Sequence, residues 1–254
     1  MTPRRVDVST ETRAPTGRTA AYLAGRLLVD PGGRTEALDR AVREANTAHV
    51  AVTHHHPDHV GAVATYAREF DLTVWARAGR EDAFAVAAGI DPDRSFRPGT
   101  TLPAGVPVTV LDTPGHAPEH VGFVCPGGVV SGDLAVAEGS VVVGAPAGDM
   151  RAYLTSLRRV HARDPNRLFP AHGPTIEDPR ATCERLLAHR LDRERRVRRA
   201  VLDGASDADE ILDAAYEKDL SGVRDLARAT VLVHLEKLAV EGRVAWDGER
   251  AHLP

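Results

Sequence analysis

The stretch VTHHHPDHVGA, residues 52–62, gathers four histidines and one aspartate within six consecutive positions. These polar residues come soon after the mostly apolar run 49–52. This change of character predicts a strand that ends at Val52, a loop that carries the polar side chains, and a helix that begins at Val60. Titratable groups are costly to gather in this way, so we expect the loop to bind something.

Alternation along an extended chain places four side chains of this loop. His54 and His56 point to the same side and should converge on one point, while Asp58 and His59 should point at a second. Imidazoles and carboxylates are common ligands of metal ions such as Zn²⁺. One loop is therefore predicted to hold part of two metal sites.

Further ligands must come from elsewhere, because a zinc site needs three or four of them. Three candidates follow short apolar runs and stand beside a glycine: His116 in LDTPGHAPEH, Asp133 in VVSGD and His172 in LFPAHG. Each is predicted to lie at a turn where a strand ends. The repeated placement indicates that the three residues meet the histidine-rich loop at one edge of a sheet.

These motifs resemble the metallo-β-lactamase superfamily, whose HxHxDH signature is matched by residues 54–59 and whose remaining ligand motifs are matched in order. The resemblance covers nearly the whole chain. It implies an α/β fold, a four-layer αβ/βα sandwich with two metal ions at one rim of the paired sheets. The implied ligand sets are His54, His56 and His116 for one ion, Asp58, His59 and His172 for the second, and Asp133 between the two.

The chemistry of such a centre is hydrolysis. Two divalent ions about 3.5–4 Å apart share a water whose pKa falls to about 7, which gives a bridging hydroxide that attacks an electrophilic carbon or phosphorus. Nitrogen and oxygen ligands suit two Zn²⁺ ions per chain, with Mn²⁺ or Fe²⁺ as alternatives. Asp58 is counted as catalytic as well as a ligand. His56 stands where redox di-iron relatives carry an acidic residue, which argues against reduction of oxygen or nitric oxide.

Other polar residues have two interpretations each. His120 is either a hydrogen-bond partner or proton shuttle of the site, and so a second catalytic residue, or a plain polar residue at a helix start. Asp30 in LLVDPG resembles the family's aspartate that braces the metal loop, but it also suits a turn before Pro-Gly. We expect four histidines to be surface or packing residues: His49, His55, His161 and His252.

The domain organisation follows from a change of character after Ile176. Short apolar strands alternate with helical segments up to that point, which predicts a hydrolase domain over residues 1–176. The prolines at 98, 103 and 107 predict a loop within it. Three helices over 178–202, 207–216 and 222–241, followed by a hairpin that turns on Asp247-Gly248, are the order of a winged-helix-like domain over 177–254.

Composition and charge suggest where the protein works. No apolar stretch is long enough for a signal peptide or a membrane span, so we expect a cytoplasmic protein with no membrane partner. The net charge of −4 gives no general attraction to nucleic acid. Cys125 and Cys183 lie in no ligand spacing and are expected to be buried free thiols. A homodimer is expected only as one option.

The substrate stays open between two classes. The order of the two domains resembles a branch of the superfamily that holds both single-strand-specific endoribonucleases and thioesterases, glyoxalase II-type hydrolases being the model for the second. We favour a small acyl substrate, a thioester or ester, over a phosphodiester in single-stranded RNA. A DNA-binding ligand sensor is a third, weaker hypothesis. The one basic cluster, in a segment that also carries Asp192 and Glu194, is predicted to be a solvated helix face: Arg193, Arg195, Arg196, Arg198 and Arg199.

Overall fold

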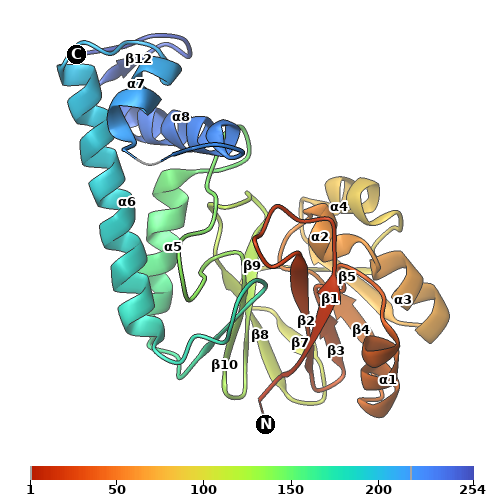
Figure 1. Cartoon of the computed structure of the whole chain (residues 1–254). Coiled ribbons are helices and arrows are strands. Elements are labelled where there is room, and N and C mark those ends of the chain that lie inside the picture. The colour runs from red at the N-terminus through yellow and green to blue at the C-terminus, as the bar shows by residue number, and fades with distance from the viewer. Residues whose placement is uncertain (1, 218) are drawn as a thin grey trace.

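Two β-sheets occupy the centre of the computed structural model, which describes residues 2–217 and 219–254 (Figure 1). The first sheet has the strand order β1 to β6: β1 (Arg4–Ser9), β2 (Arg18–Ala24), β3 (Leu27–Val29), β4 (His49–Ala51), β5 (Thr73–Arg77) and β6 (Arg94–Phe96). The second has the order β11-β10-β9-β8-β7: β7 (Thr101–Pro103), β8 (Pro107–Asp112), β9 (Val121–Cys125), β10 (Gly128–Gly132) and β11 (Leu168–Pro170).

Helices cover the outer face of each sheet. Those of the first sheet are α1 (Glu36–Glu44), α3 (Val63–Phe70) and α4 (Glu81–Ala88), while α5 (Met150–Arg163) and the first half of α6 (Pro179–Leu202) pack on the second. A third apolar cluster lies between the two sheets. The layers are thus helix, sheet, sheet and helix, and the predicted four-layer sandwich is confirmed.

Burial on both faces explains the composition of the central strands. In β4, Val50 packs toward α1 and α3, whereas its neighbour Ala51 packs between the sheets. Leu28 and Val29 of β3 divide in the same way. Strands that are covered on both faces need nearly continuous apolar sequence, because neither face meets water.

Two features of residues 1–176 differ from the sequence predictions. The histidine-rich stretch forms a short helix, α2 (Pro57–Val60), where a loop is predicted, because Pro57 has the fixed φ that suits the first helical position. The proline-rich segment forms the β7–β8 hairpin, in which Pro103 lies opposite Pro107. Proline is tolerated there because β7 is an edge strand.

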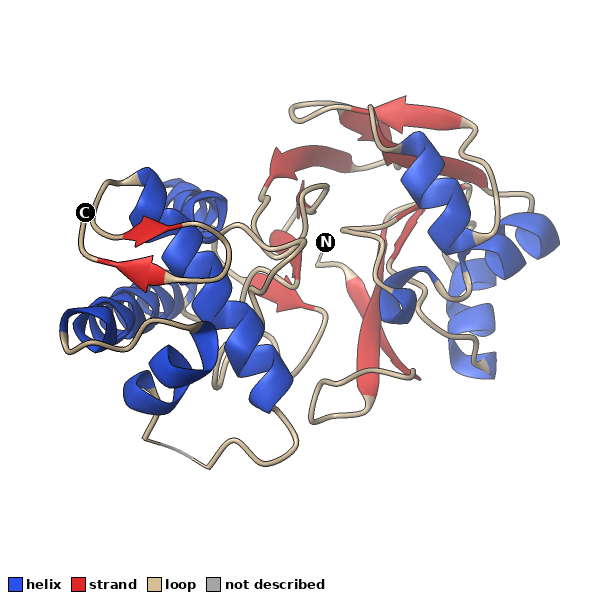
Figure 2. Cartoon of the chain, turned by 90° about the horizontal axis from the view of Figure 1, so that it is seen from above, coloured by secondary structure: helices blue, strands red, loops and turns tan. Residues whose placement is uncertain are grey.

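The C-terminal region contains the predicted helices and hairpin. It consists of the second half of α6, α7 (Ala208–Ala215), α8 (Arg224–Val240) and the antiparallel pair β12 (Ala245–Trp246) and β13 (Ala251–His252). These elements share their own apolar cluster, and Figure 2 shows them gathered at one side of the sheets. The single helix α6 joins this cluster to the layer beside α5 (Figure 1), so the predicted boundary at residues 176/177 stays a prediction.

Two smaller expectations concern thiols and membranes. Cys125 and Cys183 are buried and free, and burial raises the pKa of each thiol to about 11. Among the helices of residues 2–217 and 219–254, none has the length and apolar character that crossing a bilayer requires.

Candidate metal centre

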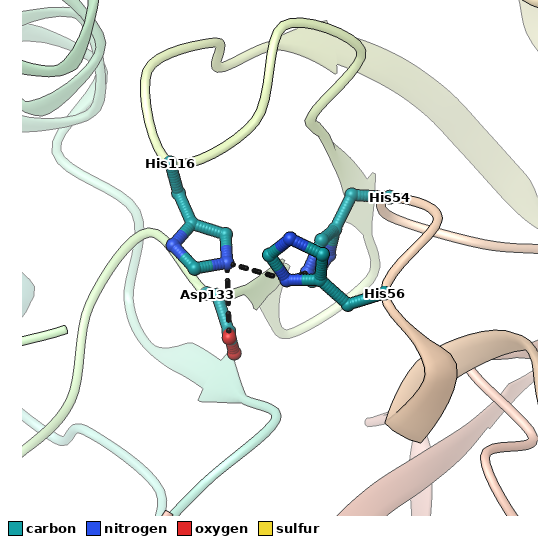
Figure 3. A group of neighbouring side chains, drawn as sticks. All are labelled: His54, His56, His116 and Asp133. Atoms are coloured by element: carbon teal, nitrogen blue, oxygen red, sulfur yellow. Dashed lines mark hydrogen bonds and ion pairs between the residues drawn. The ribbon is translucent and has the colours of Figure 1, made fainter. Parts of the chain in front are cut away.

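Four of the predicted ligands meet at the carboxyl ends of β4 and β10 and form the first group: His54, His56, His116 and Asp133 (Figure 3). Their ligand atoms all lie within 4.8 Å of one another. His56 Nδ1 lies 2.9 Å from His54 Nε2 and 3.0 Å from His116 Nε2. Asp133 Oδ2 is 3.4 Å from the same nitrogen of His116.

The other three predicted ligands form the second group: Asp58, His59 and His172. Asp58 and His59 lie on α2, and His172 follows β11. Asp58 Oδ2 is 3.4 Å from His172 Nε2, and Asp133 Oδ1 is 3.5 Å from that nitrogen. Asp133 therefore turns one oxygen to each group. The structure brings all seven residues into one cluster, in the two sets that the resemblance implies.

Hydrogen bonds on the far side of the rings orient three of the histidines. His59 Nδ1–H donates to Asp30 Oδ2 at 2.9 Å, His116 Nδ1–H to the Val142 carbonyl at 2.6 Å, and His172 Nδ1–H to the Arg18 carbonyl at 2.9 Å. Each bond turns the Nε2 atom of its ring toward the centre. This is the arrangement that fixes the tautomer of a metal-binding imidazole.

Asp30 braces the histidine-rich stretch and does more than form a turn. Its carboxylate accepts hydrogen bonds from the backbone N–H and the hydroxyl of Thr53, at 2.7 and 2.8 Å, in addition to the bond from His59. It is 1% exposed and has a left-handed backbone with φ of 53°. Of the two interpretations of Asp30, the structure supports the brace.

The donor set suits a cation better than protons. His59 Nε2 and Asp133 Oδ1 are buried and have no hydrogen-bond partner in the described chain. In the first group the ring nitrogens His54 Nε2, His56 Nδ1 and His116 Nε2 meet within hydrogen-bond distance. The Nε2 atoms of His54 and His116 carry lone pairs when the Nδ1 atoms of the same rings are protonated. Buried polar atoms are seldom left unsatisfied. Divalent metal ions would satisfy these atoms, so the residues present fit such ions.

The electrostatics of the two groups differ. Burial and neighbouring histidines hold the pKa of His54 well below its usual value and lower that of His56 to about 4. For His59, burial alone would lower the pKa, but the carboxylates of Asp30 and Asp133 outweigh it and raise the pKa to about 9. For His172 burial lowers the pKa, but the hydrogen bond with Asp58, the charge of Asp133 and the bond to the Arg18 carbonyl together outweigh it and raise the pKa.

His120 lies directly before strand β9, so the alternative of a helix-start residue is wrong. It is fully buried, and its Nδ1–H donates to the Thr113 carbonyl at 2.9 Å. Its Nε2 accepts the backbone N–H of Asp133 at 3.1 Å. Burial and His116 lower its pKa to about 3. Both ring nitrogens are thus held by the protein.

The histidines expected to lie outside the centre have other partners. His55 packs edge-on against Phe84, and its backbone N–H donates to Glu119 at 3.1 Å. His49 lies beside Trp75, and His161 pairs with Glu184 at 2.9 Å. His252 is the exposed residue of β13.

Sequence reasoning missed the partners that act through the backbone. The carbonyls of Val142 and Arg18 orient two histidines, yet a carbonyl leaves no trace in residue type. Thr19, whose hydroxyl donates to Asp58 Oδ2 at 3.5 Å, is a fully buried polar residue in an apolar strand. That contrast is the signal by which it could have been found.

Comparison with known proteins gives one family. The model of the metallo-β-lactamase superfamily matches residues 15–172, which include all seven clustered residues. The chain is 30% identical to a protein named β-lactamase-like protein 2 homolog from Drosophila melanogaster, over 89% of this chain and 84% of the relative. It is 37% identical over 110 residues to a hydroxyacylglutathione hydrolase from Xanthomonas campestris, which is 42% of this chain and 40% of that enzyme.

A solved structure extends the likeness to the whole chain. The crystal structure of a metallo-β-lactamase family protein from Thermus thermophilus matches with a TM-score of 0.78 at 25% identity. The match covers 99% of this chain and 98% of the other. The C-terminal helices and hairpin therefore have counterparts in that protein.

Proposed function

Because the chain belongs to the metallo-β-lactamase superfamily and is a metal-dependent hydrolase, we propose that it uses two divalent metal ions to hydrolyse a small acyl substrate, a thioester or ester. The observation that carries the proposal is the position of Asp133. One of its oxygens lies 3.4 Å from His116 Nε2 and the other 3.5 Å from His172 Nε2, so one carboxylate serves both groups.

The metal ions supply chemistry that the side chains lack. Bound at the two groups, they would lower the pKa of a water and polarise the substrate carbonyl. We propose zinc, since nitrogen and oxygen donors without a thiolate suit it, with manganese or iron as alternatives. The protein holds the donors in place: Asp30 orients His59, and Thr19 orients Asp58.

His120 has a positioning role in this proposal and transfers no proton to or from the substrate. Its Nε2 accepts the backbone N–H of Asp133, while its Nδ1–H is donated to Thr113. A shuttle needs a nitrogen that is free to take up and release a proton. The bond to Asp133 instead fixes the loop on which the shared carboxylate stands.

The arginines of α6 favour an acyl substrate over RNA. Arg195 pairs with Asp192 at 3.0 Å and Arg199 with Asp203 at 2.8 Å. Arg193 is buried, so the prediction of a solvated helix face is wrong for this residue, and its guanidinium lies 3.3 Å from the centre of the Tyr216 ring. Binding of RNA relies on cations that face phosphates, and these cations already have partners. The partial likeness to a hydroxyacylglutathione hydrolase points toward thioesters.

The same argument weakens the DNA-sensor hypothesis. On α8, Arg228 pairs with Asp209 at 3.0 Å, and Lys237 is buried against Glu194 at 2.7 Å. A helix that reads DNA presents free cations and polar groups to the groove. A sensor also has no need of seven clustered metal donors.

The deciding experiment pairs metal analysis with two substrates. Purified protein is assayed for metal content and for cleavage of one S-acyl thioester and one short single-stranded RNA, with Asp58→Ala and His55→Gln as variants. We expect about two metal ions per chain and thioester hydrolysis that falls about 100-fold or more in Asp58→Ala. His55→Gln is the matched control, because it changes the same motif at a residue that faces Phe84.

Each result separates the candidates. RNA cleavage that is lost in Asp58→Ala would replace the acyl proposal with the endoribonuclease. Retention of thioester hydrolysis in Asp58→Ala would contradict a role of this carboxylate at the centre. Protein that binds no metal and cleaves neither substrate would remove both enzyme proposals.

A further inference from the structure

One stretch of chain touches the first group at two places. The connecting segment, residues 134–149, leads from β10 to α5 and begins directly after Asp133. Farther along it, the Val142 carbonyl accepts the Nδ1–H of His116 at 2.6 Å. The position of this segment therefore affects both the shared carboxylate and one of the three histidines.

Two buried side chains from the helical layer hold that segment. The Tyr153 hydroxyl of α5 donates to the Leu134 carbonyl at 2.9 Å. The Arg190 guanidinium of α6 donates to the Val141 carbonyl and lies 5.4 Å from the centre of the Tyr153 ring. Tyr153 is fully buried and Arg190 is 3% exposed. Tyr153 is thus bonded next to Asp133, which belongs to the first group. Arg190 is bonded next to Val142, whose carbonyl orients His116.

The environment of Arg190 is unusual for a buried charge. Its partners in the described chain are a carbonyl and an aromatic face, with no carboxylate among them. Taking a guanidinium out of water is costly when no anion compensates it. The carbonyl bond and the cation–π contact offset part of that cost only in this one arrangement. Arg190 is therefore fixed, and it fixes the carbonyl of Val141 in turn.

The C-terminal helices add further bonds to the same segment. Arg185 of α6 donates to the carbonyls of Gly139 and Val136, at 2.6 and 2.9 Å. The N–H of Ala145 donates to the Ala229 carbonyl of α8 at 3.1 Å. The segment has no regular secondary structure of its own over residues 134–149, so these contacts determine its course.

We propose that Arg190 is a positioning residue for the first group: through Tyr153 and the carbonyl of Val141 it sets where Asp133 and His116 lie. The inference rests on the proposed metal binding and deepens it. It gives the helical layer and the C-terminal helices a part in assembling the metal centre, beyond covering the sheet. Arg190 contacts no ligand side chain and acts through the backbone on either side of them.

The test measures metal retention. Protein is dialysed against a graded series of chelator concentrations, and its zinc content is determined by elemental analysis. Arg190→Met is made alone, in His172→Gln, which disables the second group, and in His116→Gln, which disables the first. We expect Arg190→Met to weaken zinc retention about 10- to 100-fold in the His172→Gln background. In the His116→Gln background the loss should be smaller, because only the shared Asp133 connects the change to the second group.

Arg193→Met is the matched control. Arg193 lies one turn farther along α6, is also buried, and also combines an aromatic face with a carbonyl, those of Tyr216 and Ala215. Its contacts lie within the C-terminal region and do not reach the connecting segment. Arg193→Met should therefore lower the thermal midpoint of unfolding while zinc retention by the first group stays at the wild-type level.

Three outcomes would overturn the inference. If Arg190→Met with His172→Gln retained as much zinc as His172→Gln alone, Arg190 would not affect the first group. Equal losses in Arg190→Met and Arg193→Met would show a general effect of destabilised helices. Wild-type protein without zinc would remove the proposed function and the inference together, whereas failure of Arg190→Met alone leaves the proposed function standing.

Tyr153→Phe keeps the test valid if Arg190→Met does not fold. This change removes only the hydroxyl that bonds the Leu134 carbonyl and keeps the ring under Arg190. We expect a several-fold loss of zinc retention by the first group and a smaller loss by the second, which shares Asp133. Retention equal to wild type by the first group would contradict the proposal.

Discussion

The two groups of the metal centre are supported in different ways. The second group is held by the first sheet: Asp30, after β3, bonds His59, and the Arg18 carbonyl of β2 bonds His172, which follows β11 of the second sheet. The first group depends on the connecting segment, which α5, α6 and α8 hold from outside the sheets. One half of the centre is thus part of the sheet, and the other half is assembled by helices distant in sequence.

The two groups also differ in charge. His54 and His56 have lowered pKa values and are neutral near pH 7, whereas the raised pKa of about 9 keeps His59 protonated in the metal-free protein. Burial dominates the first case, and nearby carboxylates dominate the second. The comparison indicates that the two groups can be disturbed separately, with Asp133 as the element they share.

The largest effect is expected when that shared element is removed. Asp133→Ala takes away the carboxylate that faces both groups, so both metal ions should bind less tightly. Loss of several kcal/mol of transition-state stabilisation corresponds to a fall in kcat/KM of about 1,000-fold or more. Metal analysis and steady-state kinetics check this. Asp133→Asn is the control, because it keeps the size of the side chain and removes its charge. An Asp133→Ala variant that retains both ions would mean that this residue does not join the two groups.

A smaller effect, confined to one group, is expected for Asp30→Ala. The change leaves the Thr53 N–H and the His59 Nδ1–H buried without their acceptor. Removing one partner of a buried charged pair costs about 3–5 kcal/mol of unfolding free energy. We also expect about 10- to 100-fold weaker metal binding by the second group.

Urea unfolding of metal-free protein and zinc retention in the His116→Gln background measure these two effects. Asp30→Asn separates them, because its amide oxygen can still accept the Thr53 N–H while the negative charge beside His59 is gone. If Asp30→Ala weakened the first group as much as the second, the separate support of the two groups would be wrong.

Much of the centre could be predicted because its ligands mark strand ends. His116, Asp133 and His172 each interrupt an apolar run beside a glycine, a pattern that residue type alone reveals. Helix bounds were predictable for a similar reason. Thr35 and Asp207, at the starts of α1 and α7, accept backbone N–H bonds as side chains of that kind do at N-caps.

The supports of the first group could not be predicted in this way. Arg190 belongs to a helix whose charged sequence indicates a solvated face, and only the packing of α6 on α5 buries it. Val142 acts through its carbonyl, which every residue has. Strand β7 was missed because proline opposes strand formation except at an edge, and the position of a strand within its sheet is a tertiary property.

The smallest effect we predict is a difference in how pH affects the two groups. A histidine must be neutral to bind a metal ion, so binding to the second group releases the proton held by His59. Below a pKa of about 9, its affinity should therefore rise about tenfold for each pH unit, the slope expected for one released proton. The pKa of His54 lies well below its usual value and that of His56 is about 4, so these two histidines add no proton release to the first group from pH 7 to 9.

Single-group variants make this measurable. Zinc affinity is determined at pH 7, 8 and 9 in His116→Gln, which keeps the second group, and in His172→Gln, which keeps the first, against a competing chelator of known pH dependence. A steeper rise of zinc affinity with pH for the second group would show that nearby carboxylates keep His59 protonated until the metal binds. Equal slopes would mean that the Asp30–His59 pair does not set the charge of that group, since the pair is the main difference between the two histidine environments.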